Sequence, residues 1–555
     1  MTELSLQDDQ SAPIILNAPD PDWWRGAVIY QIYPRSFQDS NGDGIGDLKG
    51  ILQRMDYIAD LGVDAIWLSP FFTSPMKDFG YDVADFEDVD PMFGTLADFD
   101  LLIDAARTRG LKVLIDLVIS HSSDMHPWFV KSRSSKDNAK ADWYVWADAK
   151  TDGSPPNNWL SLFGGSAWEW DATRRQYYLH NFLASQPDLN FHNPDVQDAV
   201  LSAARFWLDR GVSGFRLDTV NFYFHDRELR DNPPHIGGVE PTTVKADNPY
   251  ALQNHLYDKS QPENLEFLER LRSLLDEYPG TTSVGEIGDD GRAIELTSAY
   301  TEVGKRLHMA YSFDLLTPHH SSSYIRHSLE KMEAGLGSGW PSWALSNHDV
   351  VRVITRWGEN YPPEDFAPLA IALLVSLRGT ACLYQGEELG LPEAEVPFEQ
   401  LQDPYGIRFW PKFKGRDGCR TPMPWTSSAP NAGFSGGSPW LPVPSGHLKQ
   451  SVEAQSGQDQ TVLEKTRRFL QWRKAHPAFA KGDFSLLDSP DGTVVFTRSM
   501  GEETLLCAFN LTSTAININL SDFAAKDLSA PGFTSSWSDG VLQLPGLQAG
   551  FAKVD

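Results

Sequence analysis

Asp218 is the residue from which the chemistry of this chain can be developed. It lies in the run Gly214–Asn221 (GFRLDTVN), which follows a helical pattern ending at Gly211 and is typical of a β-strand with its emerging loop. Since side chains alternate along a strand, Arg216 and Asp218 are predicted on one face. A cation beside a carboxylate lowers its pKa and keeps it ionised and nucleophilic. A structural Arg–Asp pair that caps the strand is the alternative.

Further polar residues that could act on a substrate stand late in, or just after, other apolar runs: Asp116, His121, Glu286, His348 and Asp349. Glu286 has apolar neighbours in the sequence and no adjacent cation, so it is predicted to hold a proton. Two carboxylates of unlike pKa can cleave an acetal, because one protonates the leaving oxygen while the other attacks the anomeric carbon. Taken singly, such a Glu or His is more often a solvated charge or a structural residue.

The loop Asp39–Asp47 (DSNGDGIGD) carries oxygen-bearing side chains at alternate positions, with glycines between them. This spacing meets most requirements of a loop that folds around one hard cation, as an EF-hand loop does. Calcium is the expected occupant, with magnesium as the second choice, and a glycine-rich solvated turn is the alternative. No organic cofactor is predicted.

The elements that position these residues read as alternating strands and helices. Residues at helical spacing, such as those within Leu48–Ala59 and Phe99–Ala106, separate runs that are almost wholly apolar, as in a parallel sheet covered by helices. The strand-like runs are Ala27–Pro34, Ala65–Pro70, Lys112–Ile119, Gly214–Val220, Thr282–Ile287, Met309–Asp314, Trp343–Asp349 and Thr380–Glu388. Eight such runs predict an α/β fold, a (β/α)8 TIM barrel, whose catalytic groups gather at the carboxyl ends of the strands.

Three other parts of the chain are predicted outside the regular barrel, which takes residues 1–121 and 195–481. Residues 122–194 are too long for one crossover and predict an inserted domain after the third strand. Residues 390–444 are rich in Pro, Gly and Trp and predict a loop-rich insertion. Residues 482–555 show short alternating runs with turn signals between them, which predict a C-terminal antiparallel β-sandwich domain.

Composition limits the partners of the chain. The 555 residues carry a formal net charge of −28, which argues against nucleic acid or an anionic membrane and favours a neutral small molecule. The three cysteines lie far apart and predict neither a disulfide framework nor a zinc site. The first twenty residues lack the pattern of a signal peptide, and no apolar run is long enough to span a bilayer, so a cytoplasmic protein, monomeric or homodimeric, is expected.

Five motifs in this order resemble the α-amylase family of glycoside hydrolases, and within it the α-glucosidase and oligo-1,6-glucosidase branch. They are DLVISH (Asp116–His121), QPDLN (Gln186–Asn190), GFRLDTVN, VGE (Val284–Glu286) and SNHD (Ser346–Asp349). The similarity covers nearly the whole chain from Trp23 onward. It implies that Asp218 is the nucleophile, Glu286 the general acid/base and Asp349 the carboxylate that steadies the transition state.

The resemblance also implies a set of substrate-binding and metal-binding residues. Arg216 would hold Asp218 ionised, His121 and His348 would bind glucose hydroxyls, Tyr81 would stack on the terminal glucose, and Asp78 would pair with Arg416 to grip it. In related enzymes, a valine directly after the nucleophile goes with cleavage of α-1,6 bonds. Thr219 stands at that position here and favours α-1,4 bonds. Ser120 stands at a position where the family commonly has asparagine. The calcium ligands would be Asp39, Asn41, Asp43, Ile45 (by its carbonyl) and Asp47.

Together these features predict a retaining, exo-acting α-glucosidase that releases glucose from the non-reducing end of short α-glucosides. Maltose-like α-1,4 substrates are preferred in this prediction, sucrose is a further candidate, and transglucosylation is a side activity. The alternatives are a sucrose-directed glucosyltransferase or isomerase, an oligo-1,6-glucosidase, and an inactive barrel that serves as a scaffold subunit.

Overall fold

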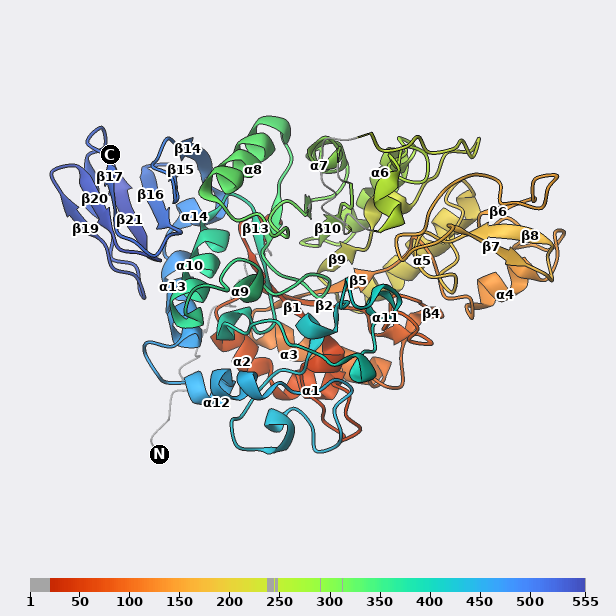
Figure 1. Ribbon diagram of the computed structural model, residues 1–555, viewed down its shortest axis with the longest axis horizontal. Helices are drawn as coiled ribbons and strands as arrows, with labels where there is room; N and C mark the ends of the chain where they lie inside the picture. The colour runs from red at the N-terminus through yellow and green to blue at the C-terminus, as the bar shows by residue number, and fades with distance from the viewer. Residues whose placement is uncertain (1–19, 237–243, 245–247, 290, 312, 555) are drawn as a thin grey trace, which may run out of the picture.

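The centre of the molecule is a parallel β-barrel (Figure 1). The computed structural model describes residues 20–236, 244, 248–289, 291–311 and 313–554. Its eight-stranded sheet has the order β11-β10-β9-β5-β2-β1-β13-β12, and a parallel bridge between Ala310 and Pro341 joins the two end strands. The strands are β1 (Val28–Ile32), β2 (Ala65–Leu68), β5 (Lys112–Leu117), β9 (Gly214–Leu217), β10 (Thr282–Glu286), β11 (Met309–Tyr311), β12 (Ser342–Ala344) and β13 (Thr380–Tyr384). The predicted barrel is confirmed.

Each barrel strand begins within a residue or two of the predicted run and ends earlier than predicted. β12 ends at Ala344, for example, so the predicted strand residues up to Asp349 belong to a loop. The strands are buried almost throughout, as expected where helices cover one face and packed side chains fill the other. The polar residues that follow them therefore lie on loops at one mouth of the barrel.

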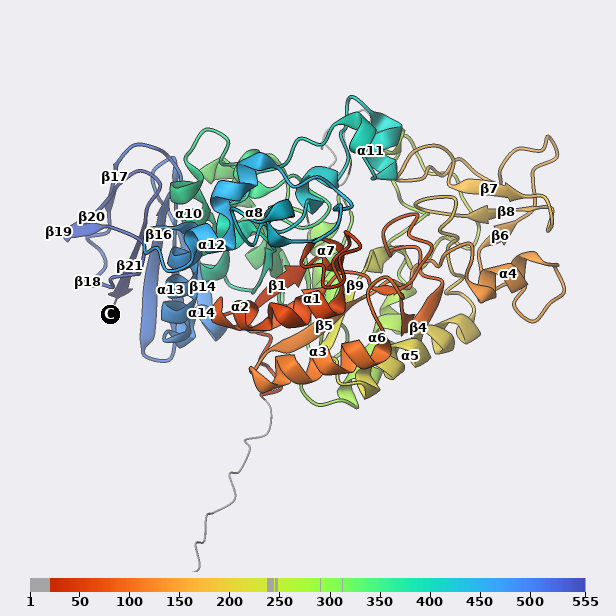
Figure 2. The same cartoon turned by 90° about the horizontal axis from the view of Figure 1, so that it is seen from below.

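Helices cover the outside of the barrel, and Figure 2 shows α3 and α5 crossing beneath it. The longer ones are α3 (Leu96–Thr108), α5 (Pro194–Asp209), α6 (Asn264–Asp276), α7 (Ala293–Tyr300), α8 (Ser322–Gly335), α10 (Pro363–Ser376) and α13 (Val462–Lys474). The continuous helical pattern predicted from Leu48 to Ala59 is wrong in one respect. Arg54 has φ −104° and ψ 10°, which divides it into α1 (Leu48–Gln53) and α2 (Met55–Asp60).

Three segments stand beside the barrel mouth. After β2, the short antiparallel pair β3 (Phe72–Thr73) and β4 (Asp85–Val89) brackets the loop that carries Asp78 and Tyr81. After β5 come α4 (Pro127–Arg133) and an antiparallel sheet of β6 (Trp146–Ala147), β8 (Gln176–Leu179) and β7 (Trp168–Asp171). The later Pro-rich and Gly-rich insertion contains α11 (Pro404–Phe409).

The C-terminal part forms two antiparallel sheets, at the end of the molecule opposite β6, β7 and β8 (Figure 1). Apolar residues of both sheets, including Val495, Leu506, Ile518 and Leu542, pack in one cluster, as in the predicted sandwich. The strands are β14 (Asp483–Leu487), β15 (Thr493–Met500), β16 (Glu503–Asn510), β17 (Ile516–Asn519), β18 (Ala525–Asp527), β19 (Ser536–Ser538), β20 (Val541–Leu544) and β21 (Ala549–Val554). Three further short helices precede these sheets in the sequence: α9 (Val353–Arg356), α12 (Val452–Gln455) and α14 (Pro477–Lys481).

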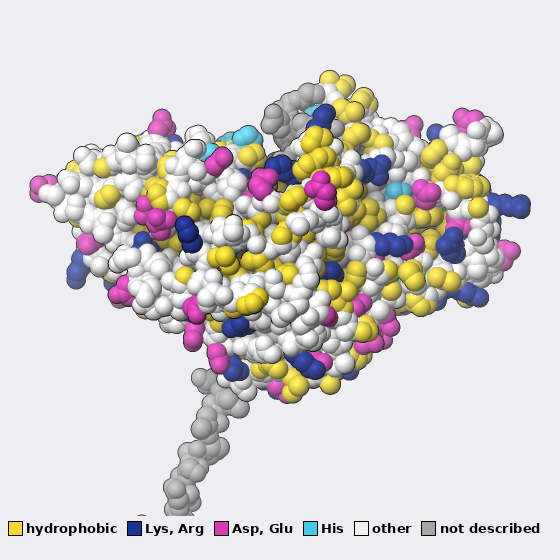
Figure 3. All heavy atoms as spheres, turned by 60° about the horizontal axis from the view of Figure 1, so that its bottom comes forward, with side chains coloured by type: hydrophobic (Ala, Val, Ile, Leu, Met, Phe, Trp, Pro, Cys, Tyr) yellow, Lys and Arg dark blue, Asp and Glu magenta, His cyan; other side chains and the backbone are white. Residues whose placement is uncertain are grey.

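The surface carries charges of both signs. On the face shown in Figure 3, acidic and basic side chains are interspersed among uncharged ones. Within the described ranges, no helix has the length and apolar character needed to cross a membrane. The predicted absence of a signal peptide concerns the first twenty residues, of which residues 1–19 lie outside the described part of the chain.

Candidate active site

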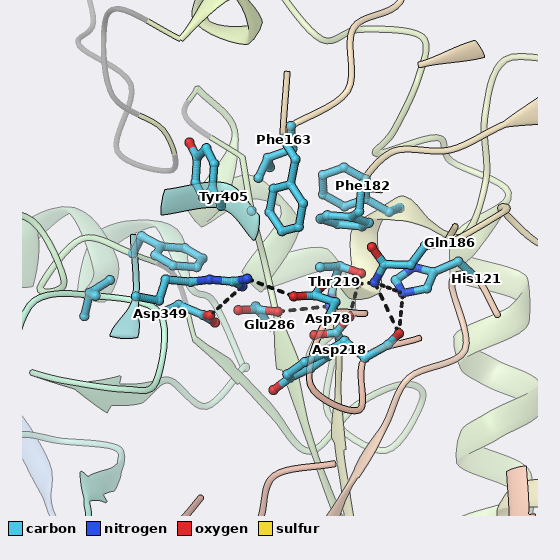
Figure 4. Close-up of a pocket in the computed structure, with 17 residues that line it drawn as sticks. Asp78, His121, Phe163, Phe182, Gln186, Asp218, Thr219, Glu286, Asp349 and Tyr405 are labelled. Atoms are coloured by element: carbon cyan, nitrogen blue, oxygen red, sulfur yellow. Dashed lines mark hydrogen bonds and ion pairs between the residues drawn. The ribbon is translucent and has the colours of Figure 1, made fainter. Parts of the chain in front are cut away.

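A cavity opens at the carboxyl ends of the barrel strands and collects most of the predicted site residues (Figure 4). Asp218 follows β9, Glu286 ends β10, and Asp349 lies on the loop after β12. The predicted residues that line the cavity are Asp78, Tyr81, His121, Asp218, Thr219, Glu286, Asp349 and Arg416, joined by Gln186 of the QPDLN motif. The barrel thus brings together carboxylates that are far apart in the sequence.

Arg216 lies beneath this cavity and bonds to three carboxylates. Its Nη1 lies 2.6 Å from Oδ1 of Asp218 and 2.8 Å from Oδ1 of Asp116. Its Nη2 lies 2.6 Å from Oε2 of Glu286 and donates to the Tyr311 hydroxyl at 2.9 Å. The prediction that Glu286 has no adjacent cation is therefore wrong, because the register of β9 and β10 places Arg216 opposite Val284, two residues from Glu286 on the same face.

Burial dominates the pKa of Asp218 and that of Glu286. It raises the pKa of Asp218 to about 6, because desolvation outweighs the attraction of Arg216. The expectation that Arg216 lowers this pKa below its ordinary value is thus wrong. Burial, with the charges of Asp218 and Asp349 nearby, raises the pKa of Glu286 to about 7 against the opposing effect of Arg216. Glu286 still has the higher pKa, as an acid/base beside an ionised nucleophile requires.

Asp349 lies in the opposite electrostatic environment. Burial alone would raise its pKa, but His348, Arg416 and Arg420 outweigh burial and hold that pKa below its usual range. Its Oδ1 lies 2.9 Å from Nη2 of Arg420 and 3.2 Å from Nη1 of Arg416. Asp349 is therefore an ionised carboxylate. Arg420 was not among the predicted site residues, although it repeats Arg416 four residues later in the GRDGCR segment.

Asp78 and Arg416 form the ion pair that the resemblance implied, with 2.8 Å between Arg416 Nη2 and Asp78 Oδ1. Arg416 also pairs with the buried Asp403 at 2.8 Å. The Gln186 side chain donates to the other oxygen of Asp78 at 3.1 Å. Burial raises the pKa of Asp78 to about 6 despite Arg416. Figure 4 shows Asp78 in the same cavity as Asp349, Glu286 and Asp218.

The two predicted histidines occupy different positions. His121 lines the cavity, and its ring nitrogens face the Ser120 hydroxyl at 2.9 Å and the Tyr81 carbonyl at 2.9 Å. His348 is fully buried and does not line the cavity; its ring stacks on that of Tyr81 with centroids 5.4 Å apart. Tyr81 and Asp349 therefore separate His348 from the cavity.

Thr219 connects Asp218, the predicted nucleophile, to its surroundings. Its hydroxyl donates to Asp218 Oδ2 at 3.3 Å and lies 3.1 Å from the Ser120 hydroxyl. Its backbone N–H donates to Glu286 Oε2 at 3.1 Å, from a left-handed conformation with φ 39° that is uncommon for threonine. Within the described part of the chain, the Ser120 hydroxyl contacts Thr219 and His121 and does not itself line the cavity.

Aromatic side chains from separate parts of the chain form the other side of the cavity. Phe163 and Phe182 come from the insertion after β5, Phe222 from the turn after Asp218, and Tyr405 from α11. Figure 4 shows Phe163, Phe182 and Tyr405 across the cavity from Asp218. The sequence predicted the two insertions but not which of their side chains reach the cavity, because contacts between residues so far apart leave no local signal.

The predicted cation loop is folded by its own hydrogen bonds. Asp39 accepts from the backbone N–H groups of Asn41, Gly42 and Gly44, and Asp47 accepts from those of Ser40 and Gly50. Among the described residues, no group of three or more His, Cys, Asp or Glu side chains is placed to hold a metal ion. The predicted set, which adds Asn41 and the Ile45 carbonyl, stays a prediction.

The sequence of this chain is similar to those of known proteins. A model of the alpha-amylase catalytic domain matches residues 31–482. A probable alpha-glucosidase of Rhizobium meliloti (strain 1021) is 57% identical over 539 residues, which are 97% of this chain and 98% of that protein.

Two solved structures share the fold. The crystal structure of an alpha-glucosyl transfer enzyme, XgtA, superposes with a TM-score of 0.93 at 56% identity and covers 96% of this chain and 100% of its own. That of the trehalulose synthase MutB from Pseudomonas mesoacidophila MX-45 has a TM-score of 0.87 at 33% identity, with 97% and 100% covered.

Proposed function

Because the chain belongs to the alpha-amylase family and is a glycoside hydrolase, we propose that it is a retaining, exo-acting α-glucosidase. The observation that carries the proposal is the cavity itself. It holds Asp218, Glu286 and Asp349 together, and the buried Asp78–Arg416 pair stands at one side, where it could grip the last glucose of a chain. The relative named as a probable alpha-glucosidase supports the same activity.

The first chemical step follows from the two raised pKa values. Near neutral pH, Asp218 is largely ionised while much of Glu286 keeps its proton. Glu286 gives that proton to the glycosidic oxygen as Asp218 attacks the anomeric carbon, and the bond to the leaving sugar breaks. A glucosyl–Asp218 ester results, with inverted configuration at the anomeric carbon. The ionised Asp349 faces positive charge that develops on the glucose ring.

The second step restores the original configuration. Glu286, now ionised, removes a proton from water, and the water oxygen attacks the anomeric carbon and releases Asp218. The product is α-glucose. A sugar hydroxyl in place of water gives transglucosylation, and the relative named as an alpha-glucosyl transfer enzyme supports this side activity.

A test of the activity begins with an aryl α-glucoside and maltotriose. We expect glucose from the non-reducing end, seen by proton NMR first as the α-anomer, and loss of turnover in Asp218→Ala by about 10⁴-fold or more. First release of β-glucose, or ordinary turnover by the variant, would contradict the mechanism. Turnover itself also excludes the inactive scaffold subunit.

The preferred linkage is a finer part of the proposal. Thr219 beside the nucleophile favours maltose-like α-1,4 bonds over the α-1,6 bonds of an oligo-1,6-glucosidase, and sucrose is a further glucose donor. A sucrose-directed glucosyltransferase or isomerase is the second candidate, and the likeness to a trehalulose synthase favours it. Products from sucrose distinguish the two, because glucose and fructose indicate hydrolysis while an isomer of sucrose indicates transfer within the cavity.

The remaining expectations belong to the proposal as well. We place the enzyme in the cytoplasm as a monomer or homodimer that acts on neutral small α-glucosides. Its predicted cation, calcium or magnesium in the Asp39–Asp47 loop, would stabilise the fold and take no part in the chemistry.

A further inference from the structure

The turn that follows Asp218 and the loop that follows Glu286 are joined by one buried side chain, that of Asn221. This residue lies in the short 3-10 turn Val220–Phe222 and is fully buried. Its Oδ1 accepts a hydrogen bond from the Gly288 N–H at 3.1 Å, and its Nδ2 donates to the Gly288 carbonyl at 3.2 Å. One amide therefore holds both backbone polar groups of a residue two positions after Glu286.

Neighbouring residues reinforce this contact. The buried Lys259 donates from Nζ to the same Gly288 carbonyl at 2.8 Å. The Ser260 hydroxyl accepts from Asn221 Nδ2 at 2.9 Å and donates to Asp289 Oδ2 at 2.9 Å. Asp289 in turn accepts from the backbone N–H of Arg292, just before α7. The loop after Glu286 is thus fixed at two consecutive residues, and Asn221 is the member that ties it to the turn after Asp218.

The separation of the two carboxylates depends on how these segments are held. A retaining mechanism needs carboxyl groups about 5–5.5 Å apart, and a misplacement of about 1 Å can cost on the order of 10²-fold in rate. Asn221 is uncharged and does not line the cavity, whereas Gly288 does. We infer that Asn221 is a positioning residue that sets the distance between Asp218 and Glu286 by holding Gly288 against the turn after the nucleophile. This inference rests on the proposed function.

Substrates with different leaving groups test this role. Maltose needs a proton on its leaving oxygen, a contribution of about 10²–10⁴-fold from a well-placed general acid, whereas α-glucosyl fluoride leaves with far less help. In Asn221→Ala we expect kcat/KM on maltose, which reports the formation of the glucosyl ester, to fall by about 10²-fold. On α-glucosyl fluoride we expect kcat/KM to fall by less than about 10-fold, because attack by Asp218 is retained and the fluoride leaves without a proton from Glu286. The comparison uses kcat/KM because kcat also contains the second step, in which Glu286 acts as base on either substrate.

Asn264 offers a matched control. It is also a fully buried asparagine, and its Nδ2 donates to the Val220 carbonyl at 2.8 Å, in the same turn that contains Asn221. Its side chain comes from α6 and, among the described residues, makes no hydrogen bond to Gly288. Asn264→Ala should therefore lower both substrates' rates to a similar, small extent and leave their ratio near that of the unchanged enzyme.

A variant of equal size guards against loss of the fold. Asn221→Asp keeps the acceptor for the Gly288 N–H and removes the donor to the carbonyl, so we expect a selective loss on maltose smaller than that of Asn221→Ala. Thermal unfolding and far-UV circular dichroism show whether each variant is folded. Equal losses on both substrates in a folded variant, or the selective loss in Asn264→Ala, would overturn the positioning role.

The unchanged enzyme and a crystal structure separate this inference from the proposed function. If the unchanged enzyme turned over neither substrate, the proposed function would fail. The positioning role would still be decided by the structure of a folded Asn221 variant: displacement of Gly288 and Glu286 relative to Asp218 supports it, and an unmoved loop contradicts it.

Discussion

Nη2 of Arg216 lies 2.6 Å from Oε2 of Glu286, while Nη1 of the same guanidinium lies 2.6 Å from Oδ1 of Asp218. One buried cation therefore contacts both the proposed nucleophile and the proposed acid/base. When Glu286 is protonated, Arg216 still neutralises Asp218; when Asp218 is bonded to glucose, Arg216 can stabilise the ionised Glu286. The cation thus favours each of the two charge states that a double displacement passes through.

The raised pKa values predict a narrow pH optimum. Burial disfavours the charged form of both carboxylates, which raises the pKa of Asp218 to about 6 and that of Glu286 to about 7. Since the reaction needs Asp218 ionised and Glu286 protonated, kcat/KM should rise through pH 6 and fall above pH 7. The two apparent values belong to the coupled pair. Steady-state kinetics on maltose across pH measure them, and an optimum below about pH 5 would contradict the assignment.

Tyr311 should influence the pH at which kcat/KM falls on the basic side, where Glu286 loses its proton. Its hydroxyl donates to Glu286 Oε1 at 3.1 Å, which favours the ionised carboxylate. In Tyr311→Phe the pKa of Glu286 should rise, moving the basic limb upward by about one pH unit, since a hydrogen bond to a charged group contributes about 1.5–3 kcal/mol. The pH dependence of kcat/KM tests this.

Tyr223 is the control for that substitution. It is fully buried, and within the described residues its hydroxyl has no hydrogen-bond partner. Tyr223→Phe should leave the basic limb in place. An equal shift in both variants would indicate a general change in burial and not the loss of the Tyr311 bond.

The sequence predicted the barrel well because its signals are local. Apolar runs such as Ala65–Pro70 differ sharply from the amphipathic segments between them, and the polar residues at their ends share one mouth by the geometry of parallel strands. Electrostatics could not be predicted in the same way. The bond between Arg216 and Glu286 depends on the register of neighbouring strands, and the raised pKa of Asp218 depends on burial by distant segments. The contact of Tyr405 with Phe163 likewise joins two insertions that are far apart in the sequence, and neither insertion's sequence predicts it.

Arg416 should matter for both binding and stability. Its removal leaves Asp78 and Asp403 buried without their cation, which should lower the free energy of unfolding by about 3–5 kcal/mol. If Arg416 also grips glucose hydroxyls, KM for maltose in Arg416→Ala should rise by about 10–10²-fold, as expected for lost charged hydrogen bonds. Chemical denaturation tests the change in the free energy of unfolding. Kinetics measured well below the unfolding transition of the variant test the change in KM.

Lys414 provides the comparison for Arg416. It lies two residues before Arg416 and forms an exposed ion pair with Glu395. Lys414→Ala should change stability by no more than about 1 kcal/mol and leave KM unaltered. Unchanged maltose kinetics in Arg416→Ala would remove the gripping role while leaving the structural one.

The Asp39–Asp47 loop can be tested by metal removal. If calcium binds there, a concentration of 100 times Kd should stabilise the protein by about 2.7 kcal/mol, and a chelator should reverse the gain. Asp43→Ala should abolish this response, because Asp43 is a predicted ligand, whereas Asp137→Ala, at an exposed acid outside the loop, should keep it. A melting temperature indifferent to calcium and magnesium would show that the loop's own hydrogen bonds are sufficient.

Thr219 should influence the choice of linkage. Its hydroxyl stands 3.3 Å from Asp218 Oδ2, at the cavity surface. In Thr219→Val a methyl group replaces that hydroxyl, so a polar contact for the hydroxyls of an α-1,4-linked sugar is lost, while the extra methylene of an α-1,6 link meets an apolar surface. Differences of this kind are worth about 1–3 kcal/mol, so the isomaltose-to-maltose ratio of kcat/KM should rise by about 10-fold or more. Thr219→Ser keeps the hydroxyl and should retain the ratio of the unchanged enzyme. If the valine variant kept the original ratio, linkage choice would lie with the aromatic side of the cavity, which Phe163, Phe182 and Tyr405 form.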